Sequence, residues 1–271
     1  MSLDNWYDTP LYYDIIFAED TAREADFLEA MMRRHARLAG ARRPPWRVLE
    51  PAAGSGRLVA ELSARGHDVS GFDINANMLA HARERLNRDG LHAILWKDSM
   101  EAFKIPSRFG FDLAHCLVST FKYLLTEDHA VAHLNRVARA LRVGGLYVLG
   151  LHLTDYHQRK PDHERWVGRR GGIKVTCNTH TWPAHRRRRR EAMRTRLQVT
   201  RHGRTHFQET RWEFRTYNAE ELKGLLNKVP AFKCVACHDF TYAPEDPRSL
   251  DDAYSDLILV LRKESGMRTE K

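Results

Sequence analysis

Cysteine and long apolar runs are both scarce in this sequence, and each scarcity excludes a class of protein. The 271 residues include four cysteines, too few for a disulfide-stabilised secreted scaffold. The longest apolar stretches, such as Leu146–Leu151, fall far short of the roughly 20 residues that a membrane-spanning helix requires. The first residues lack the basic and apolar segments of a secretory signal. We therefore expect a cytoplasmic protein with reduced thiols and no membrane partner.

Positive charge is abundant, and its distribution is uneven. The composition, 42% apolar and 29% charged, is that of an ordinary globular protein. A net charge of +9 would suit a nucleic-acid partner. However, residues 157–217 contain 17 Lys and Arg against 5 Asp and Glu, a balance of +12, whereas the rest of the chain carries −3. The basic excess therefore belongs to one segment.

Predicted strands and helices alternate over the first 150 residues, which favours a mainly parallel α/β sheet. After an amphipathic helix at 20–39, short apolar strands are predicted at 46–49, 68–72, 93–96, 111–118 and 146–151, with helices between them. From 165 to 217 the helical period gives way to β-rich stretches, which predicts an antiparallel insertion. Asn218 and Glu221 then form a capping-box pattern for a helix, and strands at 233–238 and 255–261 follow.

A glycine-containing turn follows the first predicted strand, where residues 50–56 read Glu-Pro-Ala-Ala-Gly-Ser-Gly. Glycines let the backbone approach a ligand closely, and the following helix offers free N–H groups. Asp73, nineteen residues after Gly54, ends the next strand, where a carboxylate can accept hydrogen bonds from a ribose diol. Together these features predict a ligand that contains a nucleoside.

Two common nucleotide ligands do not fit this turn. The third glycine of a dinucleotide fingerprint would fall at Val59, and the Gly-Lys-Ser/Thr of a P-loop is absent. Glu50, at the end of the first strand, would repel a pyrophosphate, whereas it suits a cationic amino-acid group.

The run from Val48 to Gly56 resembles motif I of class I S-adenosylmethionine-dependent methyltransferases, with Ala52 in place of the first glycine. The resemblance continues at 71–74, 97–100, 111–116 and 141–146. It implies a methyltransferase with S-adenosyl-L-methionine as cofactor. It also implies an α/β, Rossmann-like, seven-stranded and mainly parallel sheet with helices on both faces and an antiparallel β insertion after the fifth strand.

The resemblance also implies a domain division and a set of cofactor-binding residues. We expect an N-terminal helical cap at 1–44, a core at 45–156 and 218–265, and a basic lid at 157–217. Asp73 would bind the ribose, Ile74 and Met78 the adenine ring, and Asp98 the adenine amino group. The full expected set is Tyr13, Glu50, Ala52, Gly54, Gly56, Asp73, Ile74, Met78, Asp98, Ser99, Cys116 and Leu117. For the N-terminal aromatic cluster, including Tyr13, anchoring of the first helix is an equal alternative to closing over the cofactor.

Methyl transfer by in-line displacement needs little beyond alignment of an N or O lone pair with the methyl carbon. We expect a small-molecule acceptor. His152 and Tyr123, just past the fifth and fourth strands, are candidate catalytic or positioning residues, with simple packing as the alternative. No metal site is expected.

The β insertion resembles the lid of glycine-type and amino-sugar N-methyltransferases. Arg194, Arg196 and Arg215 are candidate substrate-binding residues, with a solvated polar face as the alternative. Arg186–Arg190 is predicted to form an exposed loop.

Two other functions stay open. A nucleic-acid methyltransferase would use the basic segment to hold phosphates, although the Asn/Asp-Pro-Pro-Tyr/Phe motif typical of base-amino methylation is absent and residues 116–119 read Cys-Leu-Val-Ser. A non-catalytic cofactor-binding protein is the second alternative. The sequence does not distinguish a monomer from a homodimer. Cys234-x-x-Cys237-His238 matches a c-type haem attachment sequence, but the missing export signal and the strand-like alternation argue against haem.

Overall fold

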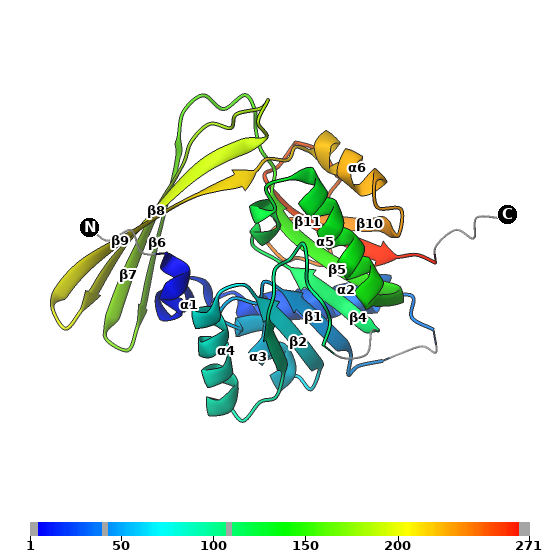
Figure 1. Cartoon of the computed structure of the whole chain (residues 1–271), viewed down its shortest axis with the longest axis horizontal. Helices are drawn as coiled ribbons and strands as arrows, with labels where there is room; N and C mark the ends of the chain where they lie inside the picture. The colour runs from blue at the N-terminus through cyan, green and yellow to red at the C-terminus, as the bar shows by residue number, and fades with distance from the viewer. Residues whose placement is uncertain (1–4, 40–42, 107–109, 266–271) are drawn as a thin grey trace.

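The computed structural model describes residues 5–39, 43–106 and 110–265, which contain two separate β-sheets (Figure 1). The first half contains η1 (Trp6–Asp8), α1 (Pro10–Phe17), α2 (Thr21–His35), β1 (Arg47–Pro51), α3 (Arg57–Ala64), β2 (Asp68–Asp73), α4 (Ala76–Arg88), β3 (Ile94–Lys97), β4 (Phe111–Cys116), η2 (Thr120–Tyr123) and α5 (Glu127–Ala140). The second half contains β5 (Leu141–His152), β6 (Asp162–Arg170), β7 (Ile173–Thr181), β8 (Arg190–Arg201), β9 (Arg204–Arg215), α6 (Ala219–Asn227), β10 (Phe232–His238) and β11 (Asp256–Lys263).

The larger sheet has seven strands in the order β10-β11-β5-β4-β1-β2-β3. The pairs from β5 to β3 are parallel, whereas β11 runs antiparallel to both β5 and β10. This arrangement confirms the predicted Rossmann-like, mainly parallel sheet.

Side chains of the central strands alternate between two hydrophobic layers, one on each face of this sheet. Val48 and Val148 pack in the layer that contains α2 and α3. Their neighbours Leu49 and Leu149 point the other way, into the layer that contains α5 and α6. Helices therefore cover both faces, as a parallel sheet requires.

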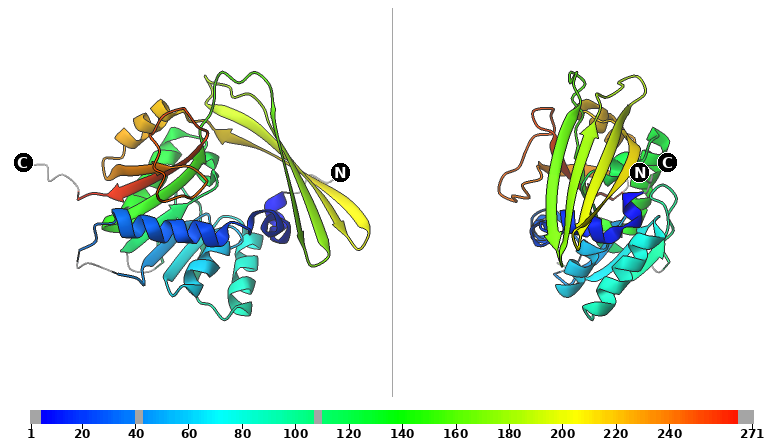
Figure 2. Two further views of the ribbon diagram at one scale, coloured as in Figure 1. Left: turned by 180° about the vertical axis from the view of Figure 1, so that it is seen from behind. Right: turned by 90° about the vertical axis from the view of Figure 1, so that its left-hand side faces the viewer.

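The smaller sheet, which we call the lid sheet, consists of β6, β7, β8 and β9 in antiparallel order and is inserted after β5, as predicted. It extends away from the seven-stranded sheet, with α1 beside it (Figure 2). One face carries the buried side chains of Val175, Cys177, Leu197 and Val199, which pack around Trp6 and α1. The lid sheet therefore buries its apolar face against the N-terminal segment of the chain.

The short helix η1 connects the lid sheet to the core. The backbone N–H of Trp6 donates to Thr210 Oγ1 on β9 at 3.0 Å. On the core side, the side-chain amide of Asn75 donates to Asp8 Oδ1 at 2.9 Å. Since Asn75 is the N-cap of α4, η1 lies directly beside the end of β2.

Two elements differ from the sequence prediction. β6 begins at Asp162 and is almost wholly exposed, so it lacks the apolar alternation by which a strand is recognised. Residues Arg186–Arg188 lie exposed in the turn before β8, in line with the prediction, whereas Arg189 packs against the core.

Neither a membrane span nor a disulfide is found in the part of the chain that the structure describes. No helix there is long and apolar enough to cross a bilayer. All four cysteines are free thiols.

Candidate cofactor and acceptor site

The carboxyl ends of β1, β2 and β4 meet where the order of the seven-stranded sheet reverses, with β1 between β2 and β4. Open α/β sheets bind ligands at such a point. A pocket opens there, and six of the predicted cofactor-binding residues line it: Tyr13, Glu50, Ala52, Gly54, Cys116 and Leu117.

The turn between β1 and α3 has the backbone conformation of a glycine-rich loop. Gly54 and Gly56 have φ values of +55° and +70°. A Cβ atom at Gly56 would lie 2.6 Å from the Cβ of Ala82, so only glycine lets α3 approach α4 here. Ala52, which replaces a glycine of the motif, also has a positive φ of +54°, a conformation that costs an L-residue roughly 1–2 kcal/mol.

Asp73 holds this turn against the end of β2. Its Oδ2 accepts a hydrogen bond from the Gly54 N–H, and its Oδ1 accepts one from the Asn75 N–H, both at 2.8 Å. Burial raises the pKa of this carboxyl, while the backbone donors act in the opposite direction. The next residue, Ile74, is 67% exposed, which is unusual for a large apolar side chain and leaves a surface for a flat apolar ring. Met78 is buried on α4.

Glu50 and His115 are buried neighbours that each carry polar atoms without a hydrogen-bond partner. The strand register places them opposite each other on β1 and β4, and the nearest oxygen and nitrogen are 3.9 Å apart. Oε2 of Glu50 and both ring nitrogens of His115 have no hydrogen-bond partner. Burial raises the pKa of Glu50 to about 8 and lowers that of His115 to about 3. A buried acceptor without a donor is costly, so this position suits a cationic group.

Asp98 and Ser99 follow β3, as the sequence predicts. The carboxylate of Asp98 accepts hydrogen bonds from the backbone N–H groups of Ser99 and Lys104, each at 2.9 Å. Each carboxylate oxygen retains a further lone pair, so Asp98 shapes its own loop and remains able to accept another hydrogen bond.

The predicted residue Tyr123 belongs to an aromatic cluster between the core and the lid sheet. Its hydroxyl lies 2.6 Å from the hydroxyl of Tyr7, and its ring contacts Trp212 and Phe214 of β9. Tyr7 in turn contacts Tyr13, which lines the pocket. Burial raises the pKa of Tyr7 to about 12 and that of Tyr123 well above its ordinary value, so both phenols are neutral and can donate or accept a hydrogen bond.

His152 lies at the end of β5, outside this aromatic cluster. Its Nδ1 is 2.8 Å from Asp256 Oδ1 at the start of β11, and its ring contacts Phe240. The partner Asp256 was not predicted from the sequence, because the two residues lie 104 positions apart and meet only through the antiparallel pairing of β5 and β11.

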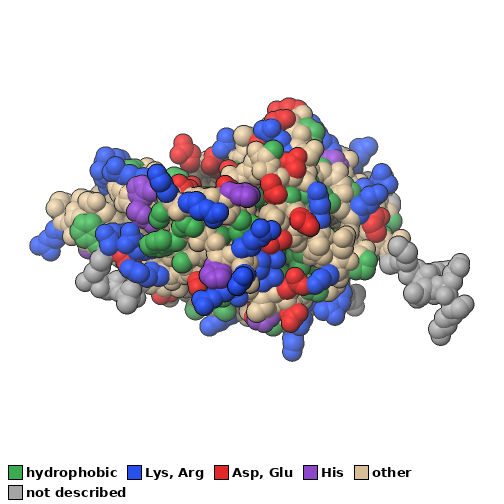
Figure 3. All heavy atoms as spheres, turned by 90° about the horizontal axis from the view of Figure 1, so that it is seen from above, with side chains coloured by type: hydrophobic (Ala, Val, Ile, Leu, Met, Phe, Trp, Pro, Cys, Tyr) green, Lys and Arg blue, Asp and Glu red, His purple; other side chains and the backbone are tan. Residues whose placement is uncertain are grey.

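The structure separates the three predicted substrate arginines. Arg194 and Arg196 alternate with the buried Thr195 and Leu197, so they lie on the face of the lid sheet opposite the N-terminal segment. There Arg196 pairs with Glu209 at 2.8 Å, and Arg194 lies over Trp182. Seen from above, Lys and Arg side chains are numerous over this part of the molecule (Figure 3). The structure does not bring Arg194 and Arg196 to the pocket.

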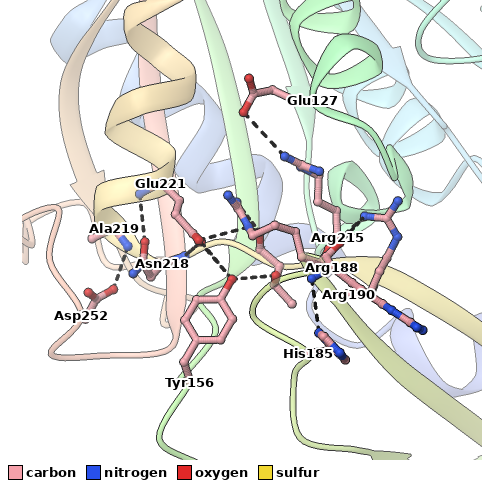
Figure 4. Close-up of polar contacts among 12 residues, drawn as sticks. Glu127, Tyr156, His185, Arg188, Arg190, Arg215, Asn218, Ala219, Glu221 and Asp252 are labelled. Atoms are coloured by element: carbon pink, nitrogen blue, oxygen red, sulfur yellow. Dashed lines mark hydrogen bonds and ion pairs between the residues drawn. The ribbon is translucent and has the colours of Figure 1, made fainter.

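Arg215 and the arginine turn instead join the lid sheet to the core (Figure 4). Arg215 donates to the carbonyl of Leu125 at 3.2 Å and lies 3.6 Å from Glu127. Arg189 lies 3.1 Å from Glu221 of α6. Both guanidinium groups lie over the ring of Tyr217, so these contacts fix the base of the lid.

A buried ion pair that the sequence did not reveal also crosses this junction. Lys122, on η2, donates to Glu191 of β8 at 2.6 Å and to the His152 carbonyl at 3.2 Å. Its side chain is 2% exposed. Nothing in the local sequence distinguishes this lysine from a surface lysine.

No group of three or more His, Cys, Asp or Glu side chains among the described residues is arranged to hold a metal ion.

The chain is similar to known methyltransferases over part of its length. Residues 48–145 match a family described as a methyltransferase domain. The chain is 31% identical to the dTDP-3-amino-3,6-dideoxy-alpha-D-glucopyranose N,N-dimethyltransferase of Streptomyces fradiae over 140 residues. The aligned region covers 51% of this chain and 50% of that protein. The chain spans about half or less of the length of the curated relatives it matches.

Solved structures resemble nearly the whole chain. A crystal structure of an S-adenosylmethionine-dependent methyltransferase from Clostridium acetobutylicum has a TM-score of 0.74 at 16% identity, over 94% of this chain and 97% of that one. DesVI from Streptomyces venezuelae has a TM-score of 0.70 at 18% identity, over 96% and 99%. SAM-bound CalS10, an amino pentose methyltransferase from Micromonospora echinaspora, has a TM-score of 0.66 at 19% identity, over 90% and 91%. At these identities the likeness is one of fold.

Proposed function

We propose that the chain is a class I S-adenosylmethionine-dependent methyltransferase, and the family match over residues 48–145 and the fold support this. It transfers a methyl group from S-adenosyl-L-methionine to a nitrogen of a small amino-sugar acceptor, held between the carboxyl edge of the seven-stranded sheet and the lid sheet. The observation that carries this proposal is the buried, unpartnered carboxylate oxygen of Glu50 in the same pocket as the turn that Asp73 braces.

The residues of the pocket and of the adjoining end of β2 fit this cofactor. The unpartnered oxygen of Glu50 suits the ammonium of its amino-acid end. The second lone pairs of the Asp73 oxygens suit ribose hydroxyls, and the exposed Ile74 suits the adenine ring. When bound, the cofactor supplies an electrophilic methyl group on a positively charged sulfur.

The choice of acceptor rests on two observations. The curated relative from Streptomyces fradiae and the structural neighbour CalS10 are named as methyltransferases of amino sugars. An unprotonated amine also needs no strong base to attack a methyl group, and the aromatic cluster around Tyr7 and Tyr123 offers neutral hydroxyls rather than a strong base.

The chain's own residues then have three tasks. The lid sheet and the cluster of Tyr7, Tyr123 and Trp212 exclude water from the acceptor. A Tyr123 hydroxyl can accept a hydrogen bond from the acceptor amine and so orient its lone pair. His152, held by Asp256 through Nδ1, can take up the released proton on Nε2.

The proposal is tested by titrating the protein with S-adenosyl-L-methionine in a calorimeter, followed by a methyl-transfer assay. The acceptors are nucleoside-diphosphate amino sugars, the matching hydroxy sugars, and RNA. We expect saturable cofactor binding and product only with the amino sugars. If product forms only with hydroxy sugars or only with RNA, the proposed acceptor class is wrong. Cofactor binding without product on any acceptor would favour a non-catalytic protein. A chain that binds no cofactor would overturn the proposal altogether.

The aromatic pair is tested by comparing Tyr123→Phe with Tyr7→Phe in the same assay. If Tyr123 orients the amine, its variant lowers kcat about tenfold, the order of one neutral hydrogen bond, with little change in cofactor affinity. Equal and small effects from both variants would assign the pair to packing.

A further inference from the structure

The Cys234-x-x-Cys237 motif brings two thiols together on the edge of the seven-stranded sheet. The two sulfur atoms lie 3.7 Å apart on β10. This pair is remote in sequence from the pocket residues and has no part in the proposed methyl transfer.

An irregularity in β10 explains why the two side chains meet. In a regular strand, residues three positions apart point to opposite faces of the sheet. In β10 the register shifts between Cys234, paired with Leu261, and Ala236, paired with Val260. Val235 is therefore an extra residue of a β-bulge, and it reverses the alternation so that both cysteines point to the same side.

The environment of the pair favours reaction at one thiol first. Cys234 is partly exposed, whereas Cys237 is 5% exposed and packs in the hydrophobic layer that contains α6. The Cys237 thiol is within hydrogen-bond distance of the Cys234 sulfur, which lowers the pKa of Cys234. By contrast, burial raises the pKa of both Cys116 and Cys177 to about 12, which leaves those thiols unreactive.

The neighbouring histidine does not complete a metal or haem site with this pair. His238 follows Cys237 directly and points to the opposite face, where its ring contacts Phe27 and its Nδ1 lies 3.2 Å from the Ala243 carbonyl. No third metal ligand joins the thiols among the described residues. Two adjacent thiols with no further ligand are suited to form a disulfide with each other.

We propose that Cys234 and Cys237 form a redox-active dithiol that is reversibly converted to an intramolecular disulfide. A low-molecular-weight disulfide such as oxidised glutathione is the oxidant. The Cys234 thiolate attacks it and expels one glutathione thiolate. The pairing with Cys234, together with burial, raises the pKa of Cys237 in the reduced protein, and the mixed disulfide removes that pairing. Cys237 then releases its proton to solvent, attacks the mixed disulfide at the Cys234 sulfur and expels the second glutathione thiolate. Two protein S–H bonds are replaced by one S–S bond, and the oxidant is reduced to two thiols.

The test equilibrates the purified full-length protein with glutathione buffers of increasing oxidised fraction. Each sample is then acid-quenched, alkylated and weighed by mass spectrometry. Of the four cysteines, we expect two to become resistant to alkylation together, with a mass loss of two hydrogen atoms, no accumulating glutathione adduct, and full reversal by dithiothreitol. Peptide mapping should place the bond between residues 234 and 237.

Two variants serve as matched controls. Cys237→Ser should retain a single glutathione adduct on Cys234, because no second thiol can displace it. A Cys116→Ser/Cys177→Ser protein should form the disulfide as readily as the wild type. The proposal is wrong if all four wild-type thiols stay alkylatable, if the disulfide links two chains, or if the Cys116→Ser/Cys177→Ser protein loses it. None of these readouts depends on methyl transfer.

Discussion

The seven-stranded sheet and the lid sheet bury their strands in different ways, and the difference explains which parts of the molecule the sequence reveals. The seven-stranded sheet is covered on both faces, and the carboxylates of Glu50 and Asp73 lie at the carboxyl ends of its strands. The lid sheet is covered on one face by the N-terminal segment, and its other face carries Arg194 and Arg196. The residues of a cofactor site can therefore be predicted from the positions where strands end. The role of a residue in the lid sheet, by contrast, depends on which face of that sheet it occupies.

The largest expected effect concerns the junction of the two sheets, where Lys122 and Glu191 form a buried ion pair. Lys122→Met should lower the free energy of unfolding by about 3–5 kcal/mol, because it leaves the Glu191 carboxylate buried without a partner. Urea unfolding followed by tryptophan fluorescence measures this loss. A Lys122→Met/Glu191→Leu protein should recover much of the stability. Equal losses in Lys122→Met and the double variant would mean that the unpaired Glu191 carboxylate is not the cause of the loss.

The next effect concerns Asp73 at the end of β2 and is expected chiefly in cofactor binding. Asp73→Ala should weaken binding of S-adenosyl-L-methionine by roughly 1.5–3 kcal/mol, the range for hydrogen bonds to a charged group. Calorimetry measures the affinity, and circular dichroism checks the fold, since the variant also leaves the Gly54 and Asn75 N–H groups without their acceptor. Asp68→Asn, at the exposed opposite end of the same strand, is the control and should bind normally.

Much of the cofactor side of the pocket could be predicted because it depends on short sequence distances. Glu50, Gly54 and Asp73 lie at the ends of consecutive strands, and a parallel sheet brings those ends together. His115 could not be predicted as the neighbour of Glu50, since their meeting depends on the register between β1 and β4.

The lid sheet illustrates a different limit of sequence analysis. Arginine alternation in residues 190–215 predicts a strand face but gives no indication of which face is covered. That choice depends on Trp6 and α1, which lie far away in the sequence. For the same reason Lys122 and Glu191, 69 positions apart, carried no signal of a buried pair.

A smaller effect is expected from the unpartnered carboxyl group of the core. Burial holds the pKa of Glu50 at about 8, above its ordinary value of 4.5. Between these values the folded protein retains a proton that the unfolded chain has released, so the free energy of unfolding falls as the pH rises. The slope is at most about 1.4 kcal/mol per pH unit. From pH 6.5 to 8 the buried His115 acts in the opposite direction, because its unfolded form still releases a proton near pH 6.5 while its folded form stays neutral. Glu50→Gln should therefore remove only the falling contribution, so that the stability of the variant in thermal unfolding falls less with pH than that of the wild type.

Cofactor binding should respond to the same group in the opposite direction. A cationic ammonium favours the ionised carboxylate, so the affinity of the wild type for S-adenosyl-L-methionine should rise from pH 6.5 to 8, while that of Glu50→Gln should stay level. Parallel pH profiles for the two proteins would show that Glu50 does not face the cofactor's ammonium.

The smallest effect is expected on the outer face of the lid sheet, and it decides between a small-molecule acceptor and a nucleic acid. An Arg194→Gln/Arg196→Gln protein should turn over a small acceptor at the wild-type rate, because both side chains point away from the pocket. Arg215→Gln is the matched variant on the same sheet. It should lower the unfolding temperature, because Arg215 is buried against the Leu125 carbonyl and Tyr217. If the outer-face variant instead loses methyl transfer to RNA, and the wild type shows a steep salt dependence of RNA binding, then the basic surface of the lid sheet is the substrate site and the small-molecule proposal is wrong.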